Sequence, residues 1–224
     1  MAAQSIEKLV EIQGRRWAAS QPHGAKRHRP CVAITRLPFA GGTELGERVA
    51  RRLDYGFFDR EIVDQIAREE RVRRDLVAGL DERVENAIER YVVAGFRQSP
   101  FRESDYLQAI TRVVATITHR GAAVLVGRGA VFLAPADQVL RVLVVAPAEW
   151  RRKRMAGILG ISEQEATERL SVLDAQRADF YRRTFDVEQT DATHYDLALN
   201  TGSIGLDRAA SLVVDALHGR FHEA

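Results

Sequence analysis

Residues 31–52 of the chain read CVAITRLPFAGGTELGERVARR, and this stretch decides the fold. Its apolar start, Cys31 to Ile34, predicts a buried strand. A turn rich in Pro and Gly follows, and then a helix that carries Leu45, Val49 and Leu53 on one face. A strand, a glycine turn and a helix in this order suit phosphate binding, because backbone N–H groups converge in the turn and the helix N-terminus adds partial positive charge. The stretch therefore predicts a phosphate-binding loop.

The composition of the chain suits one α/β domain. It has 224 residues, of which 46% are hydrophobic and 29% charged, and its net charge is +2. This charge creates no overall field that would demand nucleic acid or a membrane as partner, and no apolar run reaches the length of a membrane span. The single cysteine, Cys31, excludes an internal disulfide and a cysteine-based zinc cluster. Because the N-terminal region lacks a hydrophobic segment, we expect no signal peptide and a cytoplasmic protein, with a homo-oligomer left open.

Strands and helices alternate along the chain. Phe57 and Phe58 give strand character after the first helix, and apolar runs predict further strands at 122–126, 139–145 and 195–200. Because the strands are apolar and separated by helices, they predict a parallel sheet covered on both faces, which is a three-layer α/β fold. Ligands of such sheets bind at the carboxyl ends of the strands. The candidate residues just past strand ends are Arg36, Gly41, Gly42, Thr43, Asp59 and Arg128.

The domain organisation follows from the segments between these strands. Residues 5–19 predict an amphipathic helix and residues 20–30 a polar linker. We therefore expect an N-terminal extension over 1–29 and one domain over 30–220. About sixty residues after the second strand contain helices and no convincing strand, which predicts a helical insert at about 60–119.

Arginines mark two helices in the second half of the chain. Arg151 and Arg154 lie one turn apart and share a face of the first helix. Ser162 with Glu165 makes a capping box, which opens a second helix that we expect to run to about Phe185. The residues that share a face of this second helix are Asp174, Arg177 and Tyr181.

Several short motifs together carry a family resemblance. They are Ile34-Thr-Arg36, Gly41-Gly42-x-Glu44-Leu-Gly46, Phe58-Asp59-Arg-Glu-Ile62, Val126-Gly-Arg128-Gly-Ala130, Asp174-x-x-Arg177-x-x-x-Tyr181 and Tyr195-Asp-Leu-Ala-Leu-Asn-Thr201. In this order the chain resembles the cytidylate kinase-like family, a branch of the P-loop nucleoside monophosphate kinases. The resemblance implies a P-loop NTPase fold whose helical insert holds a monophosphate and whose arginine-bearing lid covers about 150–185. It also implies nucleotides as partners and transfer of the γ-phosphoryl of ATP, with Mg²⁺, to CMP or a related monophosphate.

The loop departs from the usual P-loop pattern G-x-x-x-x-G-K-[ST]. With Gly41 as the last glycine, Arg36 takes the first glycine position, Gly42 the lysine position and Thr43 the hydroxyl position. We prefer this alignment because it keeps Thr43 as a Mg²⁺ ligand. A shift by one residue would instead place Leu37 at the first glycine position, Thr43 at the lysine position and Glu44 at the hydroxyl position. Either alignment lacks the lysine, and none of the chain's three lysines is near in sequence.

A second departure lies at Phe39. Members of the family tend to read Tyr-Gly-Ser-Gly-Gly-Arg here, and this chain has Phe39 at the first of those glycines and Thr43 at the arginine. Phenylalanine lacks the freedom of glycine at positive φ. We therefore expect the loop to have another shape or to be closed.

The resemblance also implies roles for single residues. The backbone N–H groups of Gly41–Thr43 would hold the donor phosphates, with Thr43 on the Mg²⁺ ion. Asp59 would help to place the acceptor or to hold the metal through water, and Arg128 would bind the acceptor monophosphate. The arginines that would neutralise phosphate charge are Arg36, Arg128, Arg154 and Arg177.

Each of these residues has a plain structural interpretation as well. Gly41 and Gly42 suit any turn between a strand and a helix, and Thr43 and Asp59 suit helix N-caps. Glu44 suits a solvated position. For Arg36, Arg154 and Arg177 the alternatives are a strand end, a solvated basic face and a local ion pair with Asp174.

Two further functions are alternatives to the enzymatic one. The missing lysine and Phe39 suggest a relative that binds a nucleotide or another phosphate ligand without turnover and acts as a regulator. The predicted helix at 5–19 suggests an interaction module that docks to a partner.

Overall fold

The computed structural model of the chain describes residues 29–68, 76, 80, 82–96 and 105–222. Within them, five parallel strands form one sheet in the order β2-β3-β1-β4-β5. The strands are β1 (Cys31–Arg36), β2 (Gly56–Phe58), β3 (Ala123–Val126), β4 (Val139–Val145) and β5 (Leu197–Asn200). They coincide with the apolar runs of the sequence, so the predicted parallel sheet is confirmed.

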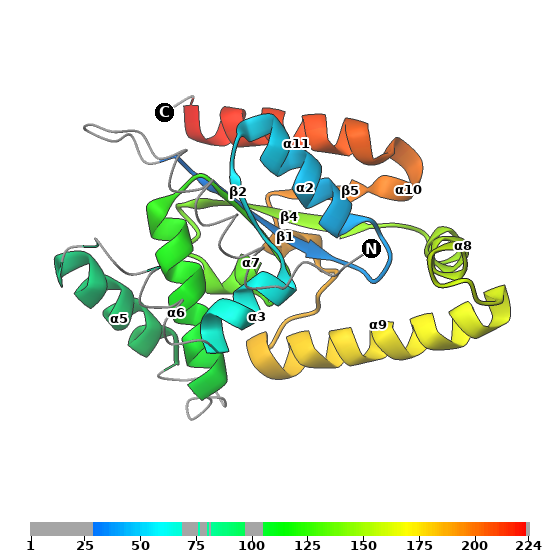
Figure 1. Cartoon of the computed structure of the whole chain (residues 1–224), viewed down its shortest axis with the longest axis horizontal. Helices are drawn as coiled ribbons and strands as arrows, with labels where there is room; N and C mark the ends of the chain where they lie inside the picture. Colours follow the sequence, from blue (N-terminus) through cyan, green and yellow to red (C-terminus); the bar gives the residue numbers. More distant parts are fainter. Residues whose placement is uncertain (1–28, 69–75, 77–79, 81, 97–104, 223–224) are drawn as a thin grey trace, which may run out of the picture.

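Helices cover both faces of this sheet (Figure 1). On one face lie α2 (Gly42–Leu53) and α11 (Leu206–His222). On the other lie α3 (Arg60–Arg68), α5 (Glu82–Phe96), α6 (Asp105–Arg120) and the short α7 (Ala130–Leu133). A 3₁₀ turn (Ala192–His194) precedes β5, and α10 (Thr201–Ile204) follows it. The three-layer α/β architecture of the P-loop NTPase type is confirmed.

The central strand β1 shows why an all-apolar strand belongs in this fold. Its side chains alternate between the two faces, with Val32 and Ile34 in the core under α2 and α11, and Cys31 and Ala33 in the core under α6. All four are fully buried. Burial of each larger aliphatic side chain contributes roughly 1.5–3 kcal/mol, so β1 anchors the residues that follow it.

Two helices form an arm that projects from one end of the molecule (Figure 1). They are α8 (Ala148–Leu159) and α9 (Glu163–Phe185), and we call them the α8–α9 arm. The Ser162 side chain accepts a hydrogen bond from the backbone N–H of Glu165 at 3.1 Å, as the capping box predicts. The arm has a small hydrophobic core of its own, built on Met155, Ala166 and Leu170.

Some predictions fall outside the described residues. The helix predicted over 5–19 is one of them, together with the polar linker up to residue 28. Within the part that the structure describes, none of the helices is both long and apolar enough to cross a membrane.

Candidate functional site

The loop between β1 and α2 turns through two residues with left-handed backbone. Phe39 has a φ of 58° and Gly41 a φ of 78°. Helix α2 begins at Gly42, so Gly41 holds the N-cap position, and no side chain caps this helix. The structural interpretation of Thr43 as the helix cap is therefore wrong.

A cavity of about 420 Å³ opens at the start of α2, and we call it the loop cavity. Gly41–Thr43 line it together with Arg36, Arg154 and Arg177. Phe39 reaches its edge, but the ring packs against the small core of the α8–α9 arm. The helix start faces open space, so Phe39 does not close the loop.

Arg36 takes up the space beside two glycines. A Cβ atom added to Gly42 would lie 2.5 Å from the Cβ of Arg36, and one added to Gly127 would lie 1.9 Å from its Nη1. The side chain thus runs from the start of α2 to the end of β3. Burial and, to a smaller extent, the nearby charge of Arg177 lower the pKa of Arg36 to about 10. At neutral pH the guanidinium still carries its charge.

Arg177 reaches the same place from α9. Its Nη1 donates a hydrogen bond to the backbone carbonyl of Arg36 at 2.6 Å, and Gln189 Nε2 donates to that carbonyl at 3.0 Å. Burial lowers the pKa of Arg177 as well, and the charge of Arg60 acts in the same direction. Among the described residues, no carboxylate forms an ion pair with Arg36 or Arg177. Two partly buried positive charges therefore line the loop cavity with no ion pair to a carboxylate in the part of the chain that the structure describes.

Arg154 is the third arginine at the loop cavity, and it does have an anionic partner. Its Nη2 donates to Oε1 of Glu44 at 2.5 Å, and its guanidinium lies over the Trp150 ring at 5.3 Å from the ring centroid. Glu44 comes from the first turn of α2. Arg154 is therefore more than a solvated basic face, while Glu44, whose side chain is 45% exposed, is both solvated and paired.

Arg151 fixes the base of the arm. It is buried, and its guanidinium donates to both carboxylate oxygens of Asp174, at 2.8 and 2.9 Å. It also donates to the carbonyls of Ala146 at 3.1 Å and Pro38 at 3.4 Å. Asp174 thus pairs with Arg151 across two helices, and the local pair with Arg177 that the spacing suggested is not formed.

Asp59 caps the helix that follows β2. Its Oδ1 accepts hydrogen bonds from the backbone N–H groups of Glu61 and Ile62, both at 3.0 Å. The N-cap interpretation is confirmed. Its negative charge also opposes the lowering of the pKa of Arg36, so the carboxylate acts on the loop cavity from the end of β2.

Arg128 sits in a left-handed turn after β3, at a φ of 51°. It forms a two-bond ion pair with Asp64 of α3, in which Nε and Oδ1 lie 2.6 Å apart. The Tyr106 hydroxyl donates to the same carboxylate at 2.8 Å. Arg128 therefore ties the end of β3 to α3 and α6.

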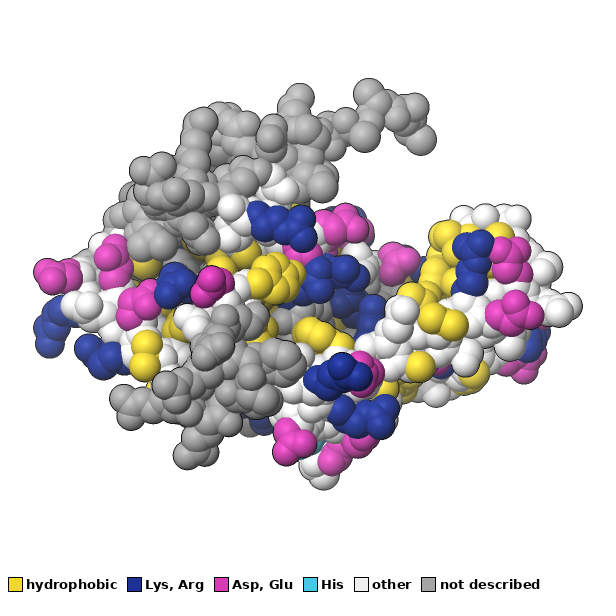
Figure 2. Space-filling view, turned by 90° about the horizontal axis from the view of Figure 1, so that it is seen from below, with side chains coloured by type: hydrophobic (Ala, Val, Ile, Leu, Met, Phe, Trp, Pro, Cys, Tyr) yellow, Lys and Arg dark blue, Asp and Glu magenta, His cyan; other side chains and the backbone are white. Residues whose placement is uncertain are grey.

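A second cavity, of about 350 Å³, lies beside Arg128, and we call it the insert cavity. Tyr106 and Ile110 of α6 line it, and Phe180 and Arg183 of α9 line it too. Because α9 also carries Arg177 of the loop cavity, one helix runs past both cavities. In Figure 2, Lys and Arg side chains gather in the hollow beside the arm.

Three of these contacts were not predicted from the sequence. Asp64 and Glu44 were not expected as partners of Arg128 and Arg154, and Gln189 was not expected at the Arg36 carbonyl. The pairs are separated by 64, 110 and 153 residues. Only the fold brings them together, and no local pattern in the chain signals them.

Comparison with curated proteins finds two partial relatives. A uronate isomerase from Corynebacterium glutamicum is 29% identical over 105 residues, which are 47% of this chain and 20% of that protein. A cytidylate kinase from Methanopyrus kandleri is 29% identical over 106 residues, which are 43% of this chain and 55% of that enzyme. The chain thus matches a fifth and about half of the length of these relatives.

Comparison with solved structures finds the same fold elsewhere. A crystal structure of an uncharacterized protein from Eubacterium ventriosum has a TM-score of 0.64 at 15% identity, covering 84% of this chain and 98% of that one. A shikimate kinase from Bacteroides thetaiotaomicron has a TM-score of 0.48 at 16% identity, with the same coverage. At this identity the first likeness shows the fold alone.

The cytidylate kinase-like family matches residues 31–203. This range is more than half of the chain and includes β1, the loop, both cavities and the α8–α9 arm. The chain therefore belongs to the cytidylate kinase-like family.

Proposed function

We propose that the protein is a nucleotide-binding phosphotransferase that moves the γ-phosphoryl group of ATP, with Mg²⁺, to CMP or a related nucleoside monophosphate. One observation carries the proposal. Arg36 and Arg177 line the cavity at the start of α2, and within the described residues neither has a carboxylate in an ion pair. Buried charges without a partner are costly, and a bound phosphate would supply the missing anion.

The donor phosphates would bind in the loop cavity. The backbone N–H groups of Gly41–Thr43 lie at the start of α2 beside the cavity, where the helix dipole favours negative charge. The Thr43 hydroxyl suits Mg²⁺, which prefers oxygen ligands and shares them with substrate phosphates. Arg36 and Arg177 would neutralise the charge on the transferring group, and Arg154 would join them from the arm.

The acceptor would lie in the insert cavity, next to Arg128, and Asp59 would help to place it from the end of β2. The aromatic side chains of Tyr106 and Phe180 can stack on a nucleobase there. An oxygen of the acceptor monophosphate would attack the γ-phosphorus of ATP, and the bond from that phosphorus to the bridging oxygen would break. The products are ADP and the nucleoside diphosphate. Such a transfer needs positioning and charge neutralisation rather than covalent catalysis by the protein.

On this proposal, the helices of about 60–119 form the acceptor-holding insert and residues of about 150–185 the lid. Residues 30–220 then act as one domain. Nucleotides are the partners that the family leads us to expect.

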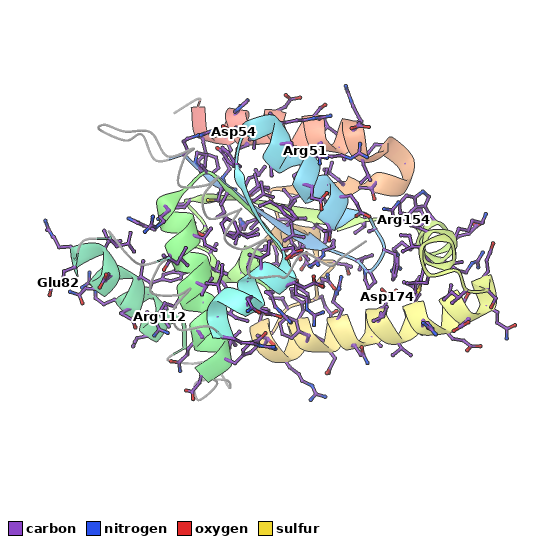
Figure 3. All side chains as sticks on the ribbon, in the orientation of Figure 1. Arg51, Asp54, Glu82, Arg112, Arg154 and Asp174 are labelled. Carbon is purple, nitrogen blue, oxygen red and sulfur yellow. The ribbon has the colours of Figure 1, made fainter. Side chains whose placement is uncertain are left out.

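A coupled assay for ADP tests the enzyme, with ATP, Mg²⁺ and each of several nucleoside monophosphates. We expect turnover with a pyrimidine monophosphate and a loss of at least about a hundredfold in Arg36→Met, because a phosphate contact of this kind contributes several kcal/mol. Arg51→Met is the matched control, since Arg51 is exposed on α2 (Figure 3). No turnover with any monophosphate would refute the enzymatic function.

The second candidate is a regulator that binds nucleotide without turnover. It is favoured by the glycine at the lysine position and by the carboxylate partners of Arg128 and Arg154. A ligand that binds only the folded state raises its apparent stability. Thermal stabilisation by MgATP without turnover would therefore favour the regulator. No effect of any nucleotide, with an oligomer that is lost on deleting residues 1–29, would favour the interaction module.

A further inference from the structure

Glu44 and Arg154 join the body of the protein to the α8–α9 arm. Glu44 lies in the first turn of α2 and Arg154 on α8, and the bond from Nη2 to Oε1 measures 2.5 Å. Both residues line the loop cavity. Arg154 lies on the side of α8 that faces α2 (Figure 3). The ion pair therefore connects the two walls of the loop cavity.

This connection is easy to break. The side chain of Glu44 is 45% exposed and that of Arg154 25% exposed. Ion pairs this exposed are weak because water solvates both charges and salt screens them. A phosphate carries more negative charge than a carboxylate and accepts two hydrogen bonds from one guanidinium. A polyphosphate in the loop cavity would take Arg154 from Glu44 and repel the carboxylate.

The arm is attached to the body at other points as well, since Arg177 and Tyr181 of α9 are bonded to the Arg36 carbonyl and to Thr35. Arg151, one turn earlier on α8, is buried and bonded to Asp174 and to the loop carbonyl of Pro38. Beyond Arg154, Ile158 is 58% exposed, and it lines the loop cavity together with the partly exposed Leu173. Figure 2 shows hydrophobic side chains on the surface of the arm. Arg151 thus holds the start of α8 in place. The bond of Arg154 to Glu44 can break, and the exposed side chains of Ile158 and Leu173 can then move toward a ligand.

We propose that the Glu44–Arg154 ion pair is a latch that regulates the loop cavity. Without a ligand it ties α8 to the start of α2, in addition to the bonds that Arg151 and Arg177 make with the loop. A polyphosphate ligand, such as the triphosphate of a nucleotide, replaces Glu44 at Arg154 and so couples its own binding to movement of the arm. The identity of this ligand rests on the proposed function, whereas the tie between α2 and α8 does not.

Hydrogen exchange of the full chain without ligand tests the tie. In Glu44→Gln, we expect the backbone amides of α8 after Arg154 to exchange about fivefold faster than in the wild type, because one exposed ion pair is lost. Glu47→Gln is the matched control. Glu47 also lines the loop cavity and loses the same charge, but it forms no ion pair among the described residues. Equal exchange of α8 in Glu44→Gln and the wild type would overturn the latch.

Calorimetric titration with MgATP and with inorganic tripolyphosphate tests the coupling. We expect both to bind about fivefold more tightly to Glu44→Gln and about tenfold more weakly to Arg154→Gln. Glu44→Gln should improve binding much less in the Arg154→Gln background than in the wild type, because Glu44 then only repels the phosphate and no longer competes for Arg154. Independent, additive effects would overturn the coupling. If neither compound binds the wild type, both the polyphosphate ligand and the proposed function are refuted. Hydrogen exchange of α8 would then still show whether the Glu44–Arg154 pair ties α8 to α2.

Discussion

Arg36 keeps a positive charge where burial disfavours it. Its guanidinium lies against Gly42 and Gly127, and its pKa falls to about 10 because of burial and the nearby charge of Arg177. A residue that lowers the stability of the folded protein in this way suits a binding site, where the ligand removes the cost. Substitution of Arg36 alone therefore measures how much folding stability its buried charge costs.

We expect Arg36→Met to raise the free energy of unfolding by about 1–3 kcal/mol, because it removes the buried charge and keeps the length of the side chain. The pKa is 12.5 in the unfolded chain and about 10 in the folded one. Below pH 9 both states are protonated, so the gain should be constant there. Above pH 10 it should shrink, because the native guanidinium of the wild type loses its proton. Denaturation by urea at several pH values measures this, and a variant less stable than the wild type at pH 7 would contradict it.

Gly42 allows a second test, of whether a side chain at this position and Arg36 compete for the same space. A side chain at this position would begin 2.5 Å from the Cβ and 2.7 Å from the Cγ of Arg36. We therefore expect Gly42→Lys to lower the free energy of unfolding by at least about 2 kcal/mol. Adding Arg36→Gly should restore at least about 1 kcal/mol of this loss. Gly157→Lys is the control, since no atom lies within 4 Å of a Cβ there. Equal losses with and without Arg36 would show that the two positions do not compete.

At the scale of the elements, the buried side chain of Arg151 holds the start of the α8–α9 arm in position. Arg151 is buried and makes four hydrogen bonds, to Asp174 and to the carbonyls of Ala146 and Pro38. The small core around Met155 is the arm's own apolar support. Arg151 therefore joins the two helices and fixes the start of the arm beside the loop, while the buried Tyr181, bonded to Thr35, fixes its other end.

We expect Arg151→Met to lower the free energy of unfolding by about 2 kcal/mol, since it leaves Asp174 and two carbonyls without their donor. The loss is below that of a fully buried pair because the side chain of Asp174 is 34% exposed. Arg152→Met should change stability by less than about 0.5 kcal/mol, because Arg152 pairs with Glu163 on the surface. Urea denaturation of the three proteins measures the difference. Equal losses in the two variants would mean that Arg151 does not hold the arm.

For the whole molecule, the position of α9 beside both cavities matters most. Arg177 lines the loop cavity, while Phe180 and Arg183, on later turns of the helix, line the insert cavity. A ligand that fills both should therefore gain from having its two halves joined, since the second half binds without a new loss of translational freedom.

We expect adenosine and cytidine joined through a polyphosphate to bind at least about tenfold more tightly than ATP. Adenosine tetraphosphate is the matched control, because it carries phosphate charge without the second nucleoside. Calorimetric titration measures the three affinities. If the joined compound binds no better than adenosine tetraphosphate, the insert cavity does not hold the second nucleoside.

The sequence predicted the layers of this molecule better than its contacts. Apolar runs such as 139–145 and the cap at Ser162 are local patterns, and the structure has them where the sequence indicated. The pair between Arg128 and Asp64 is different, because its members lie 64 residues apart and meet only through β2 and β3. Spacing along a helix likewise suggested the wrong partner for Asp174. Local patterns limit which residues share a face, but they do not determine which distant charge that face will meet.

The competition between Arg36 and Gly42 for one space also bears on how such a loop evolves. Exchanging a strand arginine for a helix lysine requires two changes, and each alone is harmful. Losing Arg36 first removes one of the three arginines from the cavity, and gaining a lysine at Gly42 first crowds the Cβ of Arg36 at 2.5 Å. The two kinds of loop are therefore separated by a fitness valley, and a lineage that carries one of them has no simple single-step route to the other.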